Sequence, residues 1–184
     1  MTQNNAIDEV EIRKGYYESG ALWWETPYVN GKKHGIALNY YESGALWHET
    51  PLVNGKRDGI VKRYYESGAL CQEALFVDGR VYGIKREYYK SGVIYYETPY
   101  FDGRIHGIDK WYFKSGALER EIPYVSGKIH GIAKRYYKSG ALRCEIPYVE
   151  GNKHGTEREY DKDNSNVCCL TLYDNDHKVA SVKI

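Results

Sequence analysis

A heptapeptide, Tyr-Tyr-Glu-Ser-Gly-Ala-Leu, recurs with small changes every 24 residues along this chain. Six glycines anchor the copies, with no insertion between them: Gly20, Gly44, Gly68, Gly92, Gly116 and Gly140. A fixed period of this length indicates a repeat architecture, in which each unit touches only its neighbours. Such arrays usually present a long surface to a partner and rarely build one deep catalytic pocket.

The composition favours strands and argues against nucleic acid as a partner. The 26 Lys and Arg residues nearly balance the 25 Asp and Glu residues, whereas an electrostatic nucleic-acid site requires a strongly basic domain. The chain contains 20 tyrosines, four tryptophans and 19 glycines but one methionine. Aromatic residues separated by frequent glycines are typical of short strands joined by turns.

The first fifteen residues are polar and acidic, without the apolar run of a signal peptide. No stretch approaches the ~18–20 apolar residues of a membrane span. The four cysteines follow no metal-binding spacing, and the adjacent pair Cys168 and Cys169 is a poor disulfide framework. We therefore expect a reduced, cytoplasmic protein for which membrane contact is not favoured, and export without a cleaved signal stays open.

One repeat, residues 16–39, contains two turn signals, at residues 18–20 and 30–35. Glycine recurs there because tight hairpin turns require positive φ. The segments between the turns, residues 22–29 and 36–41, have the length of strands. The sequence therefore predicts an all-β fold, a single elongated array of stacked antiparallel β-hairpins with roughly fourteen strands.

We expect three parts: residues 1–15 as a lead-in with a half-repeat strand, residues 16–159 as six repeats, and residues 160–184 as a degenerate capping repeat. Counting one period from Gly140 gives Asn164, which we expect to take positive φ because asparagine tolerates it best among the other residues. Atypical end units are expected as caps, since a bare sheet edge invites further pairing.

Two segments resemble a known repeat. Residues 28–35 read Tyr-Val-Asn-Gly-Lys-Lys-His-Gly, similar to the core of the MORN repeat, and residues 40–46 resemble its bacterial variant. The resemblance covers about residues 10–160, with departures at Asp58, Leu75, Tyr82 and Phe113. It implies the hairpin fold. It also implies an antitoxin or immunity protein, or, as for MORN proteins elsewhere, a scaffold that contacts proteins and phospholipid.

Positions that differ between repeats are the candidates for partner binding. We call the residues at one equivalent position of all repeats a column. Where a column contains Trp, Glu and Arg, its side chains are interpreted as pointing to solvent or to a partner, not into the core. Tryptophan, tyrosine and arginine are enriched at interface hot spots. In the alternative interpretation, some of the aromatic rings stack over neighbouring repeats. The partner-binding residues predicted in this way are Trp23, Trp24, Trp47, His48, Arg63, Glu87, Tyr95, Tyr96, Trp111, Glu119, Arg120, Arg135 and Arg143.

Three other recurring sets are interpreted structurally. A constant glutamate column is expected to form ion pairs or backbone hydrogen bonds with the lysine-rich turn: Glu25, Glu49, Glu73, Glu97, Glu121 and Glu145. Four turn histidines lie too far apart to share a zinc ion: His34, His106, His130 and His154. A basic column is interpreted as a solvated strand face paired with acids: Lys62, Arg86, Lys110, Lys134 and Arg158. The sequence thus predicts no catalytic residue, no metal and no cofactor.

These observations predict a non-enzymatic protein-binding module. The expected function is that of a bacterial immunity protein or antitoxin, which neutralises a cognate toxin by binding it and occluding its active site. The alternative is a MORN-type scaffold on anionic phospholipid or on cytoskeletal proteins. We expect a monomer in the free state, and edge-to-edge dimerisation is left open.

Overall fold

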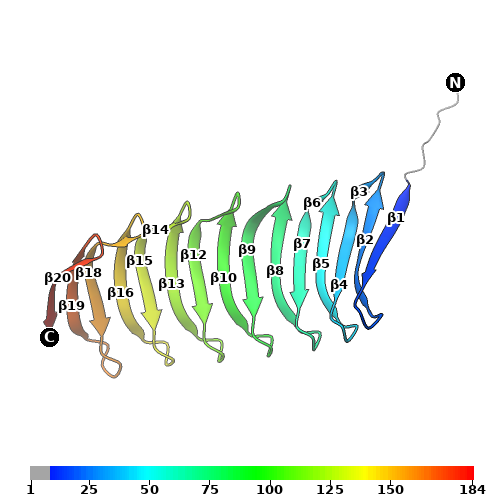
Figure 1. Ribbon diagram of the computed structural model, residues 1–184. Coiled ribbons are helices and arrows are strands. Elements are labelled where there is room, and N and C mark those ends of the chain that lie inside the picture. The colour runs from blue at the N-terminus through cyan, green and yellow to red at the C-terminus, as the bar shows by residue number, and fades with distance from the viewer. Residues whose placement is uncertain (1–8) are drawn as a thin grey trace. The chain divides into compact units, whose positions relative to one another are not determined.

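The computed structural model describes residues 9–184, which form strands and turns (Figure 1). The chain divides into two compact units, here called the N-terminal unit, which ends at Val81, and the C-terminal unit, Tyr82–Ile184. Each is described by itself. Of the lead-in predicted over residues 1–15, residues 1–8 lie outside the described part.

The N-terminal unit is an antiparallel sheet in which strands that follow one another in the sequence pair with each other. Its strands are β1 (Val10–Tyr16), β2 (Leu22–Val29), β3 (Lys32–Lys33), β4 (Gly35–Tyr40), β5 (Leu46–Val53), β6 (Lys56–Arg57), β7 (Gly59–Tyr64) and β8 (Leu70–Val77). The half-repeat strand expected in the lead-in is β1, which pairs with β2 along its whole length.

The C-terminal unit repeats this antiparallel arrangement. Its strands are β9 (Arg80–Tyr88), which begins just before the boundary, β10 (Ile94–Phe101), β11 (Arg104–Ile105), β12 (Gly107–Tyr112), β13 (Leu118–Val125), β14 (Lys128–Ile129), β15 (Gly131–Tyr136), β16 (Leu142–Val149), β17 (Asn152–Lys153), β18 (Gly155–Tyr160), β19 (Val167–Asp174) and β20 (His177–Lys183). The predicted fold class, all-β with sequential antiparallel hairpins, is confirmed in both units.

The structure has 20 strands where about fourteen were expected, because most repeats break their second strand near the turn. The turn itself is shorter than the predicted residues 30–35. Asn30 and Gly31 both have positive φ, 49° and 76°, as a two-residue hairpin turn requires. The strand then breaks at His34, whose amide donates to the Pro27 carbonyl at 3.0 Å. Gly35 follows with a φ of 105°, and a Cβ there would lie 2.9 Å from Pro27 Cγ.

The turns at the other end of each hairpin form as predicted. Gly20 has a φ of 84° and donates its amide to the Tyr17 carbonyl at 3.0 Å. The extrapolation to Asn164 is wrong, because Ser165 takes the positive φ, 59°. The corresponding loop between β18 and β19 closes from Asp161 to Asn166, one residue more than the span from Tyr17 to Ala21. The extra residue moves the position of positive φ from residue 164 to residue 165.

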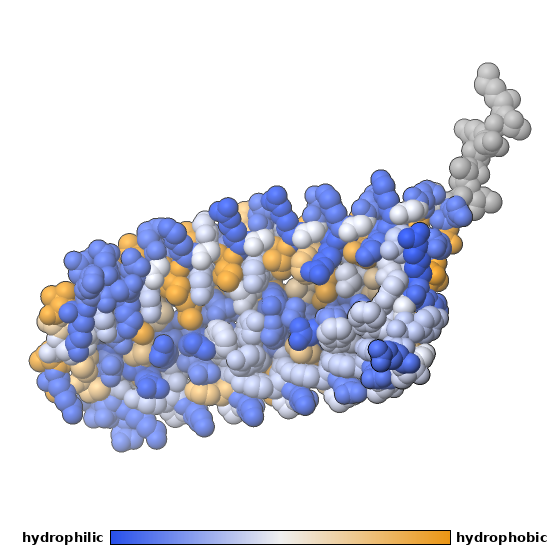
Figure 2. Space-filling view, viewed as in Figure 1, coloured by the Kyte–Doolittle hydropathy of each residue, from blue (hydrophilic) through white to orange (hydrophobic). Residues whose placement is uncertain are grey.

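The two faces of the strands differ in burial. Among residues 9–184, the buried side chains of each unit all belong to one face of its strands, called the inner face: Thr26, Ala37, Leu52 and Ala74 in the N-terminal unit, and Thr98, Asp109, Ala133, Cys144, Ile146, Glu157 and Thr171 in the C-terminal unit. On the opposite, outer face, Ile36 and Ile108 remain 53% and 50% exposed. Figure 2 shows hydrophobic residues reaching the surface between hydrophilic turns. No helix in residues 9–184 is long and apolar enough to cross a membrane.

The constant glutamates lie on the outer face and join neighbouring strands. Tyr40 Oη donates to Glu25 Oε1 at 2.7 Å, and Lys14 Nζ lies 3.1 Å from Glu25 Oε2. Equivalent Tyr–Glu pairs recur, for example Tyr112 with Glu97 at 2.9 Å. The expected ion pairs therefore form, but their basic partners come from adjacent strands and not from the lysine-rich turn. This regular network is the constant part of the scaffold.

Candidate functional site

Within each unit, two of the positions that vary between repeats form a line across the paired strands. In the N-terminal unit, cross-strand register places neighbours side by side in the order Trp24, Asn39, His48, Arg63, Gln72. Side chains alternate between the two faces of a strand. Trp24 therefore shares the inner face with buried Thr26, and Asn39 shares it with buried Ala37. We call this line the variable row.

The C-terminal unit carries an equivalent variable row. Its order is Glu87, Tyr96, Trp111, Arg120, Arg135, Cys144, Glu159. Two columns that are distant within a repeat, represented by Tyr96 and Trp111, thus become direct neighbours through strand pairing. Eight of the predicted residues lie in these two rows, where strand pairing makes them neighbours. The comparison of repeat positions did not predict this adjacency.

A third varying column reaches the inner face through an irregularity in the strand. The pairing register shifts between Gly15 and Tyr16, which leaves Trp23 as the extra residue opposite them. Such a bulge redirects a side chain. Consecutive rings consequently lie side by side: Trp47 and His48 centroids are 4.3 Å apart, and Tyr95 and Tyr96 centroids 5.2 Å apart.

The bulged residues also pack against the scaffold. The Trp23 ring lies 5.9 Å from Tyr17, and the Tyr95 ring lies 5.0 Å from Tyr89. The alternative interpretation, in which aromatic residues cover neighbouring parts of the repeat, therefore describes part of their contacts. Trp23 nevertheless keeps 44% of its surface exposed. Arg63, Arg135 and Arg143 are exposed as well, whereas the remaining predicted residues are half-buried.

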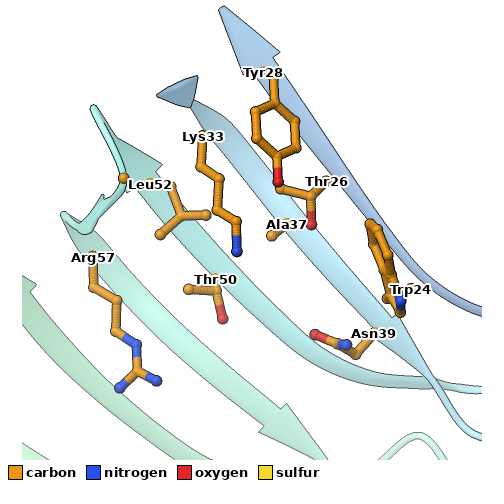
Figure 3. Close-up of a pocket in the computed structure, with 10 residues that line it drawn as sticks. Trp24, Thr26, Tyr28, Lys33, Ala37, Asn39, Thr50, Leu52 and Arg57 are labelled. Atoms are coloured by element: carbon orange, nitrogen blue, oxygen red, sulfur yellow. The ribbon is translucent and has the colours of Figure 1, made fainter. Parts of the chain in front are cut away.

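In the N-terminal unit the variable row borders two adjoining hollows. The larger, about 360 Å³, is lined by residues from β2 to β6, with Lys33 pointing toward Thr50 (Figure 3). The second, about 220 Å³, shares Asn39, Thr50 and Arg57 and extends to Arg63 and Gln72. Small and medium side chains thus leave open polar space on this face.

Two residues of this unit show how closely the row is fitted. The Trp24 indole lies directly over Gly15, where an added Cβ would approach Nε1 to 2.1 Å. Burial lowers the pKa of His48, and the positive charges of Arg63 and Arg57 lower it further. The His48 imidazole is therefore kept neutral between cationic neighbours.

In the C-terminal unit the same positions are filled by stacked rings. Tyr96 and Trp111 stack with centroids 4.8 Å apart and planes 16° from parallel. The Arg120 guanidinium lies 4.0 Å from the centroid of the Trp111 ring. Tyr96 Oη donates to Glu87 Oε1 at 2.7 Å, and burial followed by this hydrogen bond raises the pKa of Tyr96.

A buried carboxylate fixes this stack from below. Asp109, 6% exposed, accepts hydrogen bonds from Thr98 Oγ1 at 2.6 Å and from Trp111 Nε1 at 2.5 Å. The comparison of repeat positions missed Asp109. The sequence did contain a signal for it, since its position also varies between repeats: Ala37, Val61, Lys85, Asp109, Ala133 and Glu157. The comparison also missed Lys33 and Arg57, near the turn, whose position in the repeat likewise varies.

One inference from the columns is wrong. Cys144 occupies a column interpreted as unable to enter the core, yet it is only 6% exposed. Its small side chain lies between the longer side chains of Arg135 and Glu159, its cross-strand neighbours, which are both exposed. Burial raises the pKa of the Cys144 thiol, which disfavours the reactive thiolate. Among residues 9–184 no group of three His, Cys, Asp or Glu side chains could hold a metal ion.

The arrangement can make contacts, offering aromatic faces, guanidinium groups and polar hollows along one face of each unit. The family model described as MORN repeat variant matches five segments, residues 33–54, 57–78, 82–102, 105–126 and 129–150. No curated protein matches the chain. The matched segments cover more than half of the sequence, so the chain belongs to the MORN repeat variant family, whose repeats generally serve as binding scaffolds.

Proposed function

We propose that this chain is an immunity protein or antitoxin that binds a cognate protein toxin across its variable rows and occludes the toxin's active site. One observation carries the proposal. Residues that differ between repeats gather on one face, whereas the constant Tyr–Glu pairs and turns maintain the backbone. MORN repeat proteins are typically non-catalytic binding modules, and occlusion requires no chemistry from this chain.

The physical properties of the rows suit a protein partner. A paired sheet loses little freedom on binding, so fewer contacts are needed for high affinity. Trp23 remains 44% exposed, and aromatic residues of this kind anchor interfaces when a partner removes them from water. The exposed guanidinium groups of Arg63 and Arg135 add charge complementarity, which discriminates between related partners.

Affinity capture with matched variants tests the proposal. The bait is the full chain, and the row variant combines Trp23→Ser, Arg63→Ser and Arg135→Ser. The control combines Ile36→Ser and Ile108→Ser, at similarly exposed outer-face positions. We expect one stoichiometric protein to be captured from a lysate of the source organism by the wild type and the control, and not by the row variant. Circular dichroism checks that all three proteins keep their sheet.

The captured protein must then be toxic, and the chain must suppress its activity at equimolar concentration. Capture by the row variant at wild-type levels would contradict the assigned face. If the captured protein keeps its activity in the complex, the chain binds it without neutralising it, and the proposed function is contradicted. The scaffold alternative predicts instead that the chain binds liposomes, with binding that rises with anionic lipid and falls with salt.

A further inference from the structure

A second feature of the C-terminal unit is a basic pocket beside its variable row. The pocket has a volume of about 190 Å³. Three strands contribute one arginine each to its lining: Arg120 from β13, Arg135 from β15 and Arg143 from β16. Phe113, Glu119 and Tyr136 complete the lining. This volume is several times the ~30 Å³ that a water molecule occupies in the liquid.

The positive charge of this pocket is not balanced within the described chain. None of the three arginines forms an ion pair within 4.0 Å in residues 9–184, and Glu119 forms none either. On the outer face, by contrast, Lys110 and Lys134 each have a glutamate within 4.0 Å. Arg120 and Arg135 are also direct cross-strand partners, and like charges in that position destabilise a sheet.

Arg120 is held in a fixed orientation. Its guanidinium stacks on the Trp111 ring at 4.0 Å, and the ring is itself held by Asp109. Arg120 Nε is buried and donates no hydrogen bond to any of the described residues. A planar guanidinium with uncommitted donors matches the two oxygens of a carboxylate.

We infer that this pocket binds a carboxylate side chain, Asp or Glu, of the partner protein, an inference that rests on the proposed function. The three guanidinium groups supply the donors, and Glu119 limits the net positive charge. The Trp111 ring contacts Arg120, and Tyr95 and Tyr96 contact Trp111, so an apolar surface for the neighbouring partner residues lies beside the charge. Trp, Tyr and Arg together are the residue types of interface hot spots.

The test needs no identified partner. The full chain, labelled with ¹⁵N, is titrated with the peptide acetyl-Asp-Glu-Asp-amide, with acetyl-Asn-Gln-Asn-amide and with inorganic phosphate, at constant ionic strength. We expect the acidic peptide to shift the Nε–Hε signals of Arg120 and Arg135 in a saturable manner, and the amide peptide to leave them unchanged. Shifts produced by phosphate alone would overturn the inference in favour of a free-anion site.

The chain provides a matched control. Arg63 occupies the same repeat position as Arg135 but lies between His48 and Gln72. Arg135→Gln should weaken acidic-peptide binding about tenfold or more, as expected for loss of a hydrogen bond between charged groups, and Arg63→Gln should leave it unchanged. Arg143→Gln, at another exposed position, should act like Arg135→Gln. Equal losses in Arg63→Gln would show general charge attraction and overturn the site.

This experiment separates the two proposals. If the acidic peptide binds as expected but no toxin is captured, the pocket stands and the proposed function fails. If a toxin is captured and inhibited with equal affinity by the wild type and Arg135→Gln, the function stands and the pocket inference fails. An absence of shifts with every probe overturns the pocket directly.

Discussion

The variable rows of the two units occupy equivalent positions and differ in what fills them. Asn39 of the N-terminal unit corresponds to Trp111 of the C-terminal unit, three periods later. Asn39 borders open hollows of about 360 and 220 Å³, whereas Trp111 stacks on both Tyr96 and Arg120. The backbone register is the same in both places. The size of the side chain at this position therefore decides whether the row is open or filled, while the strand register stays the same.

The residue two positions before Asn39 or Trp111 changes together with it, and in the C-terminal unit it stabilises the large ring. Buried Ala37 in the N-terminal unit corresponds to buried Asp109 in the C-terminal unit. Asp109 accepts the indole proton of Trp111 and the hydroxyl proton of Thr98. A carboxylate at Ala37 would have no indole donor, because Asn39 stands in that place. The Trp111 ring and its buried hydrogen-bond acceptor, Asp109, therefore occur in the same repeat.

The largest expected effect comes from removing that ring. Trp111→Ala deletes the stack with Tyr96 and Arg120 and leaves Asp109 with one donor fewer, so we expect a loss of about 2 kcal/mol of unfolding free energy, less than for a fully buried tryptophan. Asn39→Ala, its match in the N-terminal unit, should change stability by about 0.5 kcal/mol or less. Urea denaturation followed by circular dichroism measures both. Equal losses would mean that the filled and open rows are energetically alike.

Much of the scaffold was predictable from the sequence because it depends on local rules. The period, the strand at residues 22–29 and the glycine turns follow from chain chemistry that repeats six times. The strand break at His34 was not predictable, since it involves the neighbouring strand: the His34 amide donates to the Pro27 carbonyl, and a Cβ on Gly35 would lie 2.9 Å from Pro27 Cγ. The extra residue in the loop ending at Asn166 likewise left no mark in the repeat pattern.

The candidate site was predictable as a set of residues but not as an arrangement. Variation between repeats identified Tyr96, Trp111 and Arg120 one by one. Their stacking depends on cross-strand register and on the bulge, which are properties of the paired strands. The interpretation of these columns as wholly exposed was wrong at Cys144, because exposure depends on the size of its neighbours.

The constant outer-face network should behave alike in both units. Burial and hydrogen bonds to Glu25 and Glu97 raise the pKa values of Tyr40 and Tyr112 to about 12. An unfolded tyrosine ionises near pH ~10, so the stability that these pairs contribute is present below that pH and is lost as the pH rises toward about 12. Tyr40→Phe and Tyr112→Phe should each remove part of this alkaline loss, by similar amounts. Urea midpoints at about pH 9 and about pH 12 measure it, and a response confined to one unit would show that the scaffold is not uniform.

The smallest expected effect separates the two rows again, through His48. Its folded-state pKa is lowered, by burial first and by Arg63 and Arg57 next, so protonation favours the unfolded chain. The stability due to neutral His48 is therefore complete above its unfolded pKa of ~6.5 and falls as the pH drops below that value. The equivalent residue in the C-terminal unit, three periods later, is Arg120. His48→Gln should reduce the acid sensitivity of the urea midpoint, and His177→Gln, at an exposed position, serves as the control. An unchanged acid profile in His48→Gln would show that the open row tolerates a third positive charge, and the contrast between a neutral row and a cationic one would then disappear.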